Sequence, residues 1–416
     1  MSSGTNVRWD ASRQGYPDRR ESGGVVRKGT SEDVRRENLT AVLRALMVDG
    51  PMSRAELGRL TGRNRSTVAS LVSDLAGLGL VDEHGPISDG TVGRPSHGVT
   101  LSSSVAAFAV HPEVDALTVA IVGLDAQVRR KVRHEFDRIP SMAEVVHLAS
   151  TVMAAMGAEE SGFRMSGIGV AVPGLVRTLD GLVRNAPHLQ WREEPLGRAL
   201  ADITSLPVHV ANDAQLGALA ERDYGAGRGV SHFVYLNGGA SGIGGAIVAG
   251  GELLGGAHGY AGELGHTPVS GSAAVDTVGI PGSLEAEVTR EELLSLLGAG
   301  HMDPESFEVA LLADRSDTIA AAVARQQKHL ATALGTVVNV LNPERIVLGG
   351  FLASLLAYDP QGLRAALETR ALAPAMEGVD IVSAQLGANL LLVGAAHRAL
   401  EPLVDDPASM SGAHTV

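Results

Sequence analysis

The chain has 416 residues, of which 44% are hydrophobic, and this length favours two or three folding units with apolar cores. Glycine is abundant at 51 residues, whereas aromatic residues make up only 3%. This composition is typical of an α/β protein and argues against RNA binding by aromatic stacking. Cysteine is absent, which excludes disulfides, thiolate nucleophiles and thiolate metal ligands. Since no apolar signal core and no run of 18 apolar residues occur, we expect a soluble cytoplasmic protein without membrane contact.

Charge is unevenly distributed along the chain, although the total of −13 is acidic. Residues 1–100 hold 14 Lys and Arg against 12 Asp and Glu, whereas the remainder holds 20 against 35. This asymmetry favours an N-terminal part that faces nucleic acid and an acidic remainder, but a balance of +2 is a weak basic footprint. Residues 1–30 are polar and rich in Gly, Arg and Ser without an apolar period, which predicts a disordered tail.

Two helices are predicted directly after the tail. The first begins at Ser31, carries apolar residues at helical spacing and ends at Gly50. The second begins with Ser53 and Glu56, which are three residues apart and can cap each other's backbone N–H groups. It is short, because Gly62 ends it.

A third helix is predicted after the N-cap residue Asn64, with one apolar stripe made of Val68, Leu71, Val72 and Leu75. A short helix, a tight turn and a helix with a polar tip make a helix-turn-helix, whose second helix reads the major groove of DNA. The residues that we expect to contact DNA here are Arg54, Arg63, Asn64, Arg65, Ser66 and Thr67. The alternative is a three-helix unit that only packs against the rest of the chain.

Residues 79–100 contain two β-prone segments around a polar, Gly-rich loop, the pattern of a β-wing. Arg94 lies between Gly93 and Pro95 in this loop, where a wing could place its guanidinium against the minor groove. The alternative is an ordinary solvated loop arginine. Together, the three helices and the wing predict a winged helix-turn-helix over residues 31–103.

Residues 104–416 alternate between apolar, β-branched runs and helical segments such as 316–340 and 387–400. This alternation predicts α/β layers, and the length suggests two lobes with a cleft between them. Asn212 and Asp213 end one of the buried strands, where a parallel sheet presents its functional edge. Taken alone, an Asp at this place is better explained as a helix cap, because a helical segment follows it.

Five segments of this region resemble the ROK family, which groups bacterial repressors and sugar kinases. They are GIGVAVPGLV, NAPHLQW, PVHVANDAQLGALAE, SGIGGAIVAGGELLGGAHGYAGELGH and LNPERIVLGG. The resemblance spans about residues 31–400, because the winged helix-turn-helix is similar to that of the family's repressors. It implies an α/β fold in which the winged helix-turn-helix precedes a two-lobed, actin-like (ribonuclease-H-like) sugar-kinase domain.

The resemblance also implies a sugar site built from His188, Asn212, Asp213, Glu263, His266 and Glu285. Asp213 matches the base that takes the proton from the transferred sugar hydroxyl in the family's kinases, and Asn212 matches a sugar contact. Carboxylates and amides suit this role, because neighbouring hydroxyl groups need paired acceptors and donors. His188 stands where many family members have Asn.

Two departures from the family pattern change what the resemblance implies. The family's zinc motif joins the His of the GELGH segment to three cysteines, and these positions are here Asp276, Val278 and Ser283. Valine cannot bind a metal and a tetrahedral zinc site needs four donors, so we expect no metal site. Packing and hydrogen bonds must then hold His266 in place.

The second departure concerns ATP. The family's kinases bind ATP phosphates with an Asp-x-Gly-Gly-Thr-like turn, but residues 111–113 are here His, Pro and Glu, and Glu113 would repel phosphate. The glycine-rich segment 238–245 and the pair Gly349-Gly350 persist, but glycines in strand turns are often architectural. We therefore expect no cofactor and no enzymatic activity.

These observations predict a sequence-specific transcriptional regulator, a repressor of carbohydrate uptake or metabolism genes, with a sugar or sugar-phosphate effector. Operator DNA with two half-sites implies a homodimer or homotetramer, since one recognition helix reads too few base pairs. One alternative is an active ATP-dependent sugar kinase with an added DNA-binding domain. Another is a DNA-binding protein whose second domain serves only for dimerisation, which the retained sugar-site residues argue against.

Overall fold

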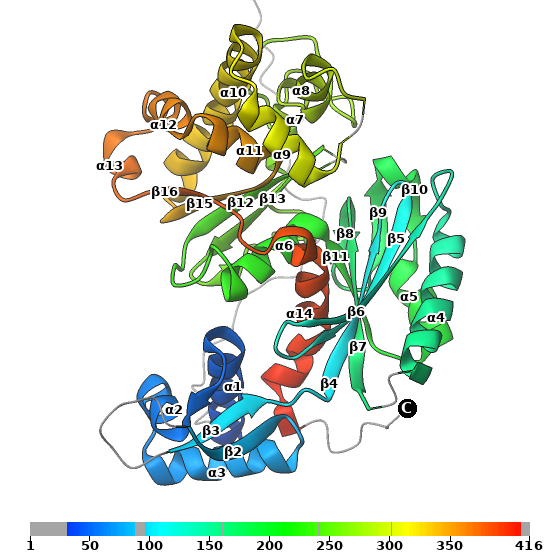
Figure 1. Ribbon diagram of the computed structural model, residues 1–416, viewed down its shortest axis with the longest axis vertical. Coiled ribbons are helices and arrows are strands. Elements are labelled where there is room, and N and C mark those ends of the chain that lie inside the picture. The colour runs from blue at the N-terminus through cyan, green and yellow to red at the C-terminus, as the bar shows by residue number, and fades with distance from the viewer. Residues whose placement is uncertain (1–30, 88–95, 160–161, 240–241, 301, 409–416) are drawn as a thin grey trace, which may run out of the picture.

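A computed structural model describes residues 31–87, 96–159, 162–239, 242–300 and 302–408 of the protein. Figure 1 shows a small N-terminal unit beside two larger lobes. The predicted α/β fold class is confirmed, since each lobe holds a five-stranded sheet with helices packed against it. Within the described ranges, no helix is both long and apolar enough to cross a membrane.

The N-terminal unit consists of three helices and a small antiparallel sheet with the strand order β1-β3-β2. Its elements are α1 (Ser31–Asp49), β1 (Met52–Ser53), α2 (Arg54–Thr61), α3 (Arg65–Gly77), β2 (Val81–Ile87) and β3 (Ser96–Leu101). The predicted capping box is present, because Ser53 and Glu56 bond each other's backbone N–H groups. Asn64 caps α3 as predicted by accepting the Thr67 N–H at 2.9 Å.

The first lobe is built on a sheet with the strand order β11-β7-β4-β5-β6. Its strands are β4 (Val105–Pro112), β5 (Ala116–Gly123), β6 (Val128–Glu135), β7 (Arg164–Val172) and β11 (Val208–Asn212). Strand β5 is fully buried, whereas β6 is rich in charged residues and largely exposed because it forms one edge of the sheet. Helices α4 (Met142–Glu159) and α5 (Leu196–Thr204) and a small sheet of β8 (Leu175–Arg177), β9 (Leu182–Ala186) and β10 (Trp191–Glu194) complete the lobe.

The second lobe is built on a sheet with the strand order β14-β13-β12-β15-β16. Its strands are β12 (Phe233–Gly239), β13 (Gly242–Ala249), β14 (Glu252–Leu253), β15 (Arg345–Gly350) and β16 (Asp380–Ser383). Its helices are α7 (Leu284–Glu287), α8 (Arg290–Leu296), α9 (Pro304–Ala313), α10 (Asp317–Leu341), α11 (Phe351–Tyr358), α12 (Pro360–Glu368) and α13 (Ala373–Met376). The long helix predicted over 316–340 is thus α10, and Asn342 ends it in the left-handed conformation.

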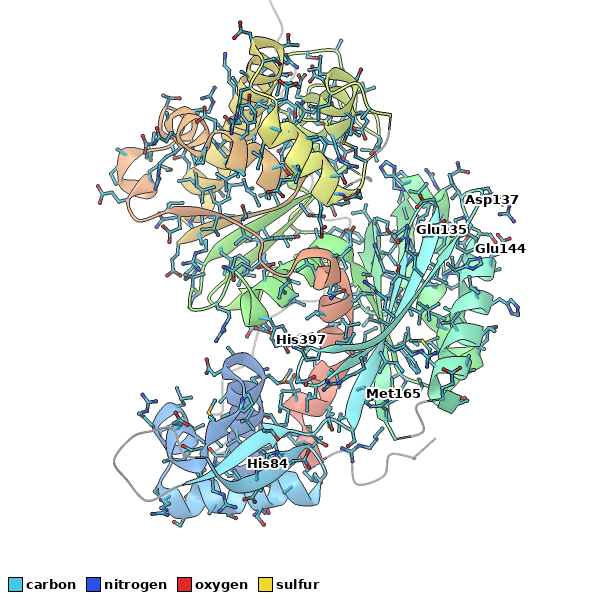
Figure 2. The ribbon with its side chains drawn as sticks, viewed as in Figure 1. His84, Glu135, Asp137, Glu144, Met165 and His397 are labelled. Atoms are coloured by element: carbon cyan, nitrogen blue, oxygen red, sulfur yellow. The ribbon has the colours of Figure 1, made fainter. Side chains whose placement is uncertain are left out.

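Two helices join the three parts of the molecule. α6 (Asp213–Tyr224) packs on the second lobe's sheet, α14 (Leu390–Asp405) packs on that of the first lobe, and the two helices contact each other. At the far end of α14, the Thr40 hydroxyl of α1 donates to the Val404 carbonyl at 2.8 Å. His397, which Figure 2 labels on α14, contacts α6, because its Nε2 atom lies 3.1 Å from the Asp223 carboxylate. The N-terminal unit therefore rests on the helix pair that links the lobes.

Candidate functional site

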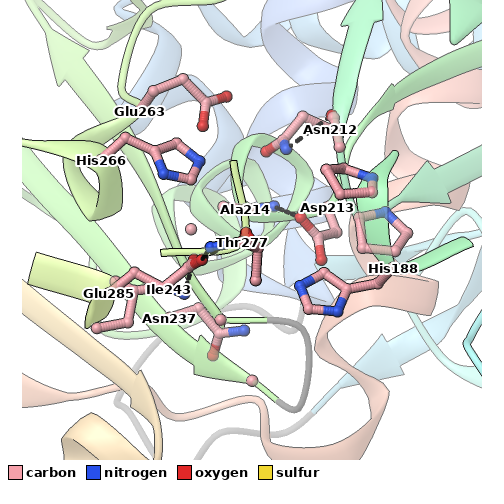
Figure 3. Close-up of a pocket in the computed structure, with 16 residues that line it drawn as sticks. His188, Asn212, Asp213, Ala214, Asn237, Ile243, Glu263, His266, Thr277 and Glu285 are labelled. Atoms are coloured by element: carbon pink, nitrogen blue, oxygen red, sulfur yellow. Dashed lines mark hydrogen bonds between the residues drawn. The ribbon is translucent and has the colours of Figure 1, made fainter. Parts of the chain in front are cut away.

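A cavity lies where the two lobes meet. Its lining comes from the ends of strands in both sheets and from the short helices η1 (Pro187–Leu189), η2 (Leu264–His266) and α7. All six predicted sugar-site residues line it, although they come from segments up to 97 positions apart in the chain: His188, Asn212, Asp213, Glu263, His266 and Glu285. Figure 3 shows Glu263 and His266 across the cavity from Asn212 and Asp213.

The junction of β11 and α6 supplies Asn212 and Asp213. The N-cap is Asn212, whose side-chain oxygen accepts the Gln215 N–H at 3.1 Å and whose side-chain amide donates to the Gly174 carbonyl at 3.1 Å. Asp213 is the first residue of α6, and one of its carboxylate oxygens accepts the Ala214 N–H at 2.7 Å. Capping therefore occupies Asn212, whereas the second carboxylate oxygen of Asp213 has no hydrogen-bond partner among the described residues.

Two carboxyl groups in the cavity have raised pKa values. For Asp213 the main cause is burial, which the charges of His111 and His188 and the Ala214 N–H partly offset. For Glu263 burial is again the main cause, and the nearby carboxylates of Asp213 and Glu285 add to it while His266 opposes it. Buried carboxyl groups that lie close together are typical of binding sites. Hydrogen-bond donors on a ligand can offset the free-energy cost of ionising them.

Glu285 is held firmly by protein groups. One of its carboxylate oxygens accepts the Ile243 N–H at 3.0 Å, and the other accepts the Thr277 hydroxyl at 2.6 Å. Gly242, which precedes Ile243, has φ 100°, and a side chain there would collide with the Glu285 carboxylate. Glu285 therefore joins the start of β13 to the wall of the cavity.

His266 is held by Asp276, whose side chain has no solvent exposure. The imidazole Nδ1 lies 2.9 Å from one Asp276 oxygen, and the other oxygen accepts the N–H groups of Val278 and Ile280 at 3.0 and 2.8 Å. Burial raises the pKa of Asp276, but the hydrogen bonds from His266, Ile280, Ser283 and Val278 outweigh it and lower the pKa to about 2. Hydrogen bonds thus hold His266, as the sequence analysis expected.

His188 and Asn237 complete the polar lining. The Nε2 atom of His188 is buried and has no hydrogen-bond partner among the described residues, which makes it available to a ligand. Asn237 was missed in the sequence analysis, although a polar residue directly before two glycines at the end of a buried strand is a usable signal. Neither lysine nor arginine occurs among the sixteen described residues that line the cavity.

The hairpin of β4 and β5, where the family resemblance places the first phosphate turn, is tied to the neighbouring strand β6 by an ion pair. Arg133 of β6 pairs with the Glu113 carboxylate, which also accepts the Thr118 hydroxyl at 3.4 Å. His111 lies 3.0 Å from the Ala171 carbonyl through its Nδ1 atom. The hairpin therefore presents a paired carboxylate where a phosphate-binding turn would present free backbone N–H groups.

The glycine-rich segments are tightly packed. A side chain at Gly244 would approach Ala214 to 2.8 Å, and one at Gly349 would approach the Asn237 side-chain oxygen to 2.7 Å. Close packing between β13 and α6, and between β15 and β12, is thus sufficient to explain both glycines.

The tip of α3 is exposed on the N-terminal unit. Arg63, Asn64, Arg65 and Ser66 are exposed and Thr67 is half-buried. Neither Arg63 nor Arg65 forms an ion pair within the described ranges, so both guanidinium groups can meet phosphates or base edges. The remaining predicted DNA contacts differ: Arg54 pairs with Glu83 of β2, and Arg94 lies outside the described residues.

Comparison with known proteins places these features in a family. The sequence profile described as "ROK family" matches residues 109–401, which is more than half of the chain. The chain belongs to the ROK family. The xylose repressor of Bacillus subtilis strain 168 is 24% identical over 380 residues, covering 89% of this chain and 97% of that protein.

Two further matches represent both branches of the family. The glucokinase of Halalkalibacterium halodurans is 31% identical over 255 residues, covering 57% of this chain and 77% of that enzyme. The crystal structure of a ROK family transcriptional regulator, described as a homologue of the Escherichia coli Mlc protein, has a TM-score of 0.73 at 23% identity. It covers 89% of this chain and 97% of that chain, which shows that the fold, including the N-terminal unit, is shared.

The zinc site implied by the family pattern does not fit the residues of this protein. Asp276 and Ser283 hydrogen-bond to one another, Val278 has no donor atom, and both Asp276 oxygens already accept hydrogen bonds. Within the described ranges, no three or more His, Cys, Asp or Glu side chains are grouped so that they could hold a metal ion.

Proposed function

We propose that this ROK family member is a DNA-binding transcriptional repressor of carbohydrate genes whose effector is a neutral sugar. The main support for this proposal is that one chain combines an exposed helix tip bearing arginines with an acidic cavity between two lobes. Similarity to a xylose repressor over 89% of the chain supports this combination, because the match includes the N-terminal unit. The cavity supports a sugar over a sugar phosphate, since its described lining holds three carboxylates and neither lysine nor arginine.

In this proposal residues 31–103 bind DNA and residues 104–416 bind the effector and form the oligomer. Arg63, Asn64, Arg65, Ser66 and Thr67 contact the operator, whereas Arg54 acts by fixing the wing strand β2 through Glu83. Two recognition helices, one from each protomer of a dimer, read two half-sites about one helical turn of DNA apart.

The sugar is held by the six predicted residues that line the cavity. The free oxygen of Asp213, the carboxyl of Glu263 and the unpartnered Nε2 of His188 bind hydroxyl groups directly. Asn212 and Glu285 have their polar atoms engaged in protein contacts, so they shape the cavity and reach the sugar through their remaining lone pairs. Because residues from both lobes take part, a bound sugar favours one spacing of the lobes over another.

We propose further that the chain does not phosphorylate its sugar. Residues 111–113 support this, because they are His, Pro and Glu and so lack the glycines whose backbone N–H groups bind phosphate in the family's kinases. The second candidate function is an ATP-dependent sugar kinase. The raised pKa of Asp213, which suits a general base, and the 31% identity to a glucokinase favour it.

The experiment begins with selection of DNA sequences from a random pool by the purified chain, followed by fluorescence anisotropy on the selected duplex. The proposal expects an inverted repeat, and a Kd that changes when D-xylose or D-glucose is added. Glucose 6-phosphate is the comparison ligand and should have little effect. A selection that enriches no sequence would overturn the DNA-binding assignment.

The kinase alternative is tested separately by incubating the protein with ATP, Mg²⁺ and each sugar and measuring ADP. The proposal expects no turnover above the Asp213→Ala variant. Turnover that the variant abolishes would establish the kinase function instead.

A further inference from the structure

Asp276 is the hub of the loop that carries His266 into the cavity. Its side chain has no solvent exposure, and it joins His266 at one end of the segment to Val278 and Ile280 near the other. Ser283, which is fully buried, bonds to it as well and caps α7, the helix that bears Glu285. One carboxylate thus fixes two walls of the cavity.

The directions of these hydrogen bonds determine the tautomer of His266. One Asp276 oxygen accepts two backbone N–H groups, so it carries no proton. The other oxygen faces Nδ1 of His266, and the low pKa of this carboxyl keeps it an acceptor at neutral pH. Nδ1 must therefore donate, and in the neutral imidazole the proton is absent from Nε2.

The ring edge opposite Nδ1 faces the cavity. His266 is one of the lining residues, and Figure 3 shows its imidazole beside Glu263 and directed toward Asn212 and Asp213. Asp276, by contrast, does not line the cavity and cannot touch a ligand there. Any effect of Asp276 on the ligand must therefore pass through His266.

We propose that Asp276 is a positioning residue that makes His266 Nε2 a hydrogen-bond acceptor for one hydroxyl group of the bound sugar. The contact between His266 Nε2 and a sugar hydroxyl rests on the proposed sugar-binding function, whereas the tautomer of His266 does not. In metal sites, the group bound to one imidazole nitrogen fixes the tautomer and the orientation of the ring. Here the Asp276 carboxylate does the same for His266 through a hydrogen bond. The selected ligand is a sugar with a hydroxyl donor at this place, and an analogue that can only accept is rejected.

The first test needs no sugar. The long-range ¹H–¹⁵N NMR spectrum of protein labelled with ¹⁵N-histidine reports the tautomer of each imidazole, and His266→Gln identifies the signal of His266. At pH 7.5 the proposal expects one His266 signal of the Nδ1–H form. The Nε2–H form, or an average of the two forms, would overturn the proposal even if sugar binding is established.

The second test uses Asp276→Asn, which keeps the shape of the side chain. Its amide oxygen continues to accept the N–H groups of Val278 and Ile280, so its NH₂ group faces Nδ1 of His266 and reverses that hydrogen bond. The His266 signal should change to the Nε2–H form. Asp314→Asn is the control, because Asp314 also accepts a backbone N–H, from Ser316 at 2.8 Å, but lies outside the cavity.

The third test measures, by calorimetry, the binding of D-xylose, D-glucose and the monofluoro-D-glucoses to the wild type and to Asp276→Asn. At one position, fluorine should weaken binding to the wild type about tenfold, because fluorine cannot donate to Nε2. The same substitution should cost Asp276→Asn at least fivefold less, because Nε2–H now donates. Equal losses in both proteins would refute the acceptor role. An Nδ1–H signal without binding of any sugar would instead refute the proposed effector, and with it this role of His266.

Discussion

Substitution of Gly394 by Ala tests how closely α14 must pack against α6. A methyl group there would lie 2.7 Å from the carbonyl carbon of Leu216 and nearer still to its oxygen. Ordinary carbon contacts are about 3.5–4.0 Å, so the two helices must separate by about 1 Å. Overpacking of this kind costs about 1–3 kcal/mol, and we expect the free energy of unfolding to fall by that amount.

Gly157 provides a matched control, because it also lies inside a helix but a methyl group added there would meet no atom of another element within 4 Å. Gly157→Ala should raise the free energy of unfolding by up to about 1 kcal/mol, since alanine favours helix. Urea unfolding followed by circular dichroism measures both variants. If Gly394→Ala is as stable as the wild type, the tight contact between α14 and α6 is not present in the protein.

Three further predictions concern the cavity, the recognition helix and the core. Asp213→Asn should raise the thermal midpoint at pH 7 by about 2 °C, because the pKa of Asp213 is raised in the folded protein and its ionisation therefore destabilises the fold as pH rises. The gain should vanish near pH 4, and thermal midpoints measured between pH 4 and pH 7 check this. Arg65→Ala should weaken operator binding about tenfold in anisotropy, whereas Arg198→Ala, an exposed arginine on α5, should not. Glu221→Ala should cost about 3 kcal/mol in urea unfolding, because Glu221 is fully buried and its carboxylate accepts the N–H groups of Ala226, Gln385 and Leu386.

Local signals explain why the N-terminal unit could be predicted closely. The capping box of Ser53 and Glu56 and the N-cap Asn64 depend only on residues three positions apart, and both are confirmed. The paired wing strands followed from the same kind of signal, since turn residues separate two β-prone segments. The fold class and the family were likewise within reach, because the strand-end motifs carry the resemblance.

Contacts between distant residues could not be predicted. The salt bridge that occupies Arg54 depends on Glu83, which lies 29 positions away, and neither residue indicates the other in the sequence. Asp276 was noted only as a lost zinc ligand, and its bond to His266 required the loop to be folded. The docking of α1 on α14 joins Thr40 to Val404, so no local pattern signals it.

The proposed repressor couples a sugar in the cavity to DNA at the recognition helix. The most direct test is the Kd for the selected operator, measured by anisotropy with and without a saturating sugar whose binding calorimetry has established. The sugar should change this Kd by about fivefold or more, and Asp213→Ala should abolish the change. If the sugar binds the protein but leaves the operator Kd unchanged, the cavity and the recognition helix are not coupled.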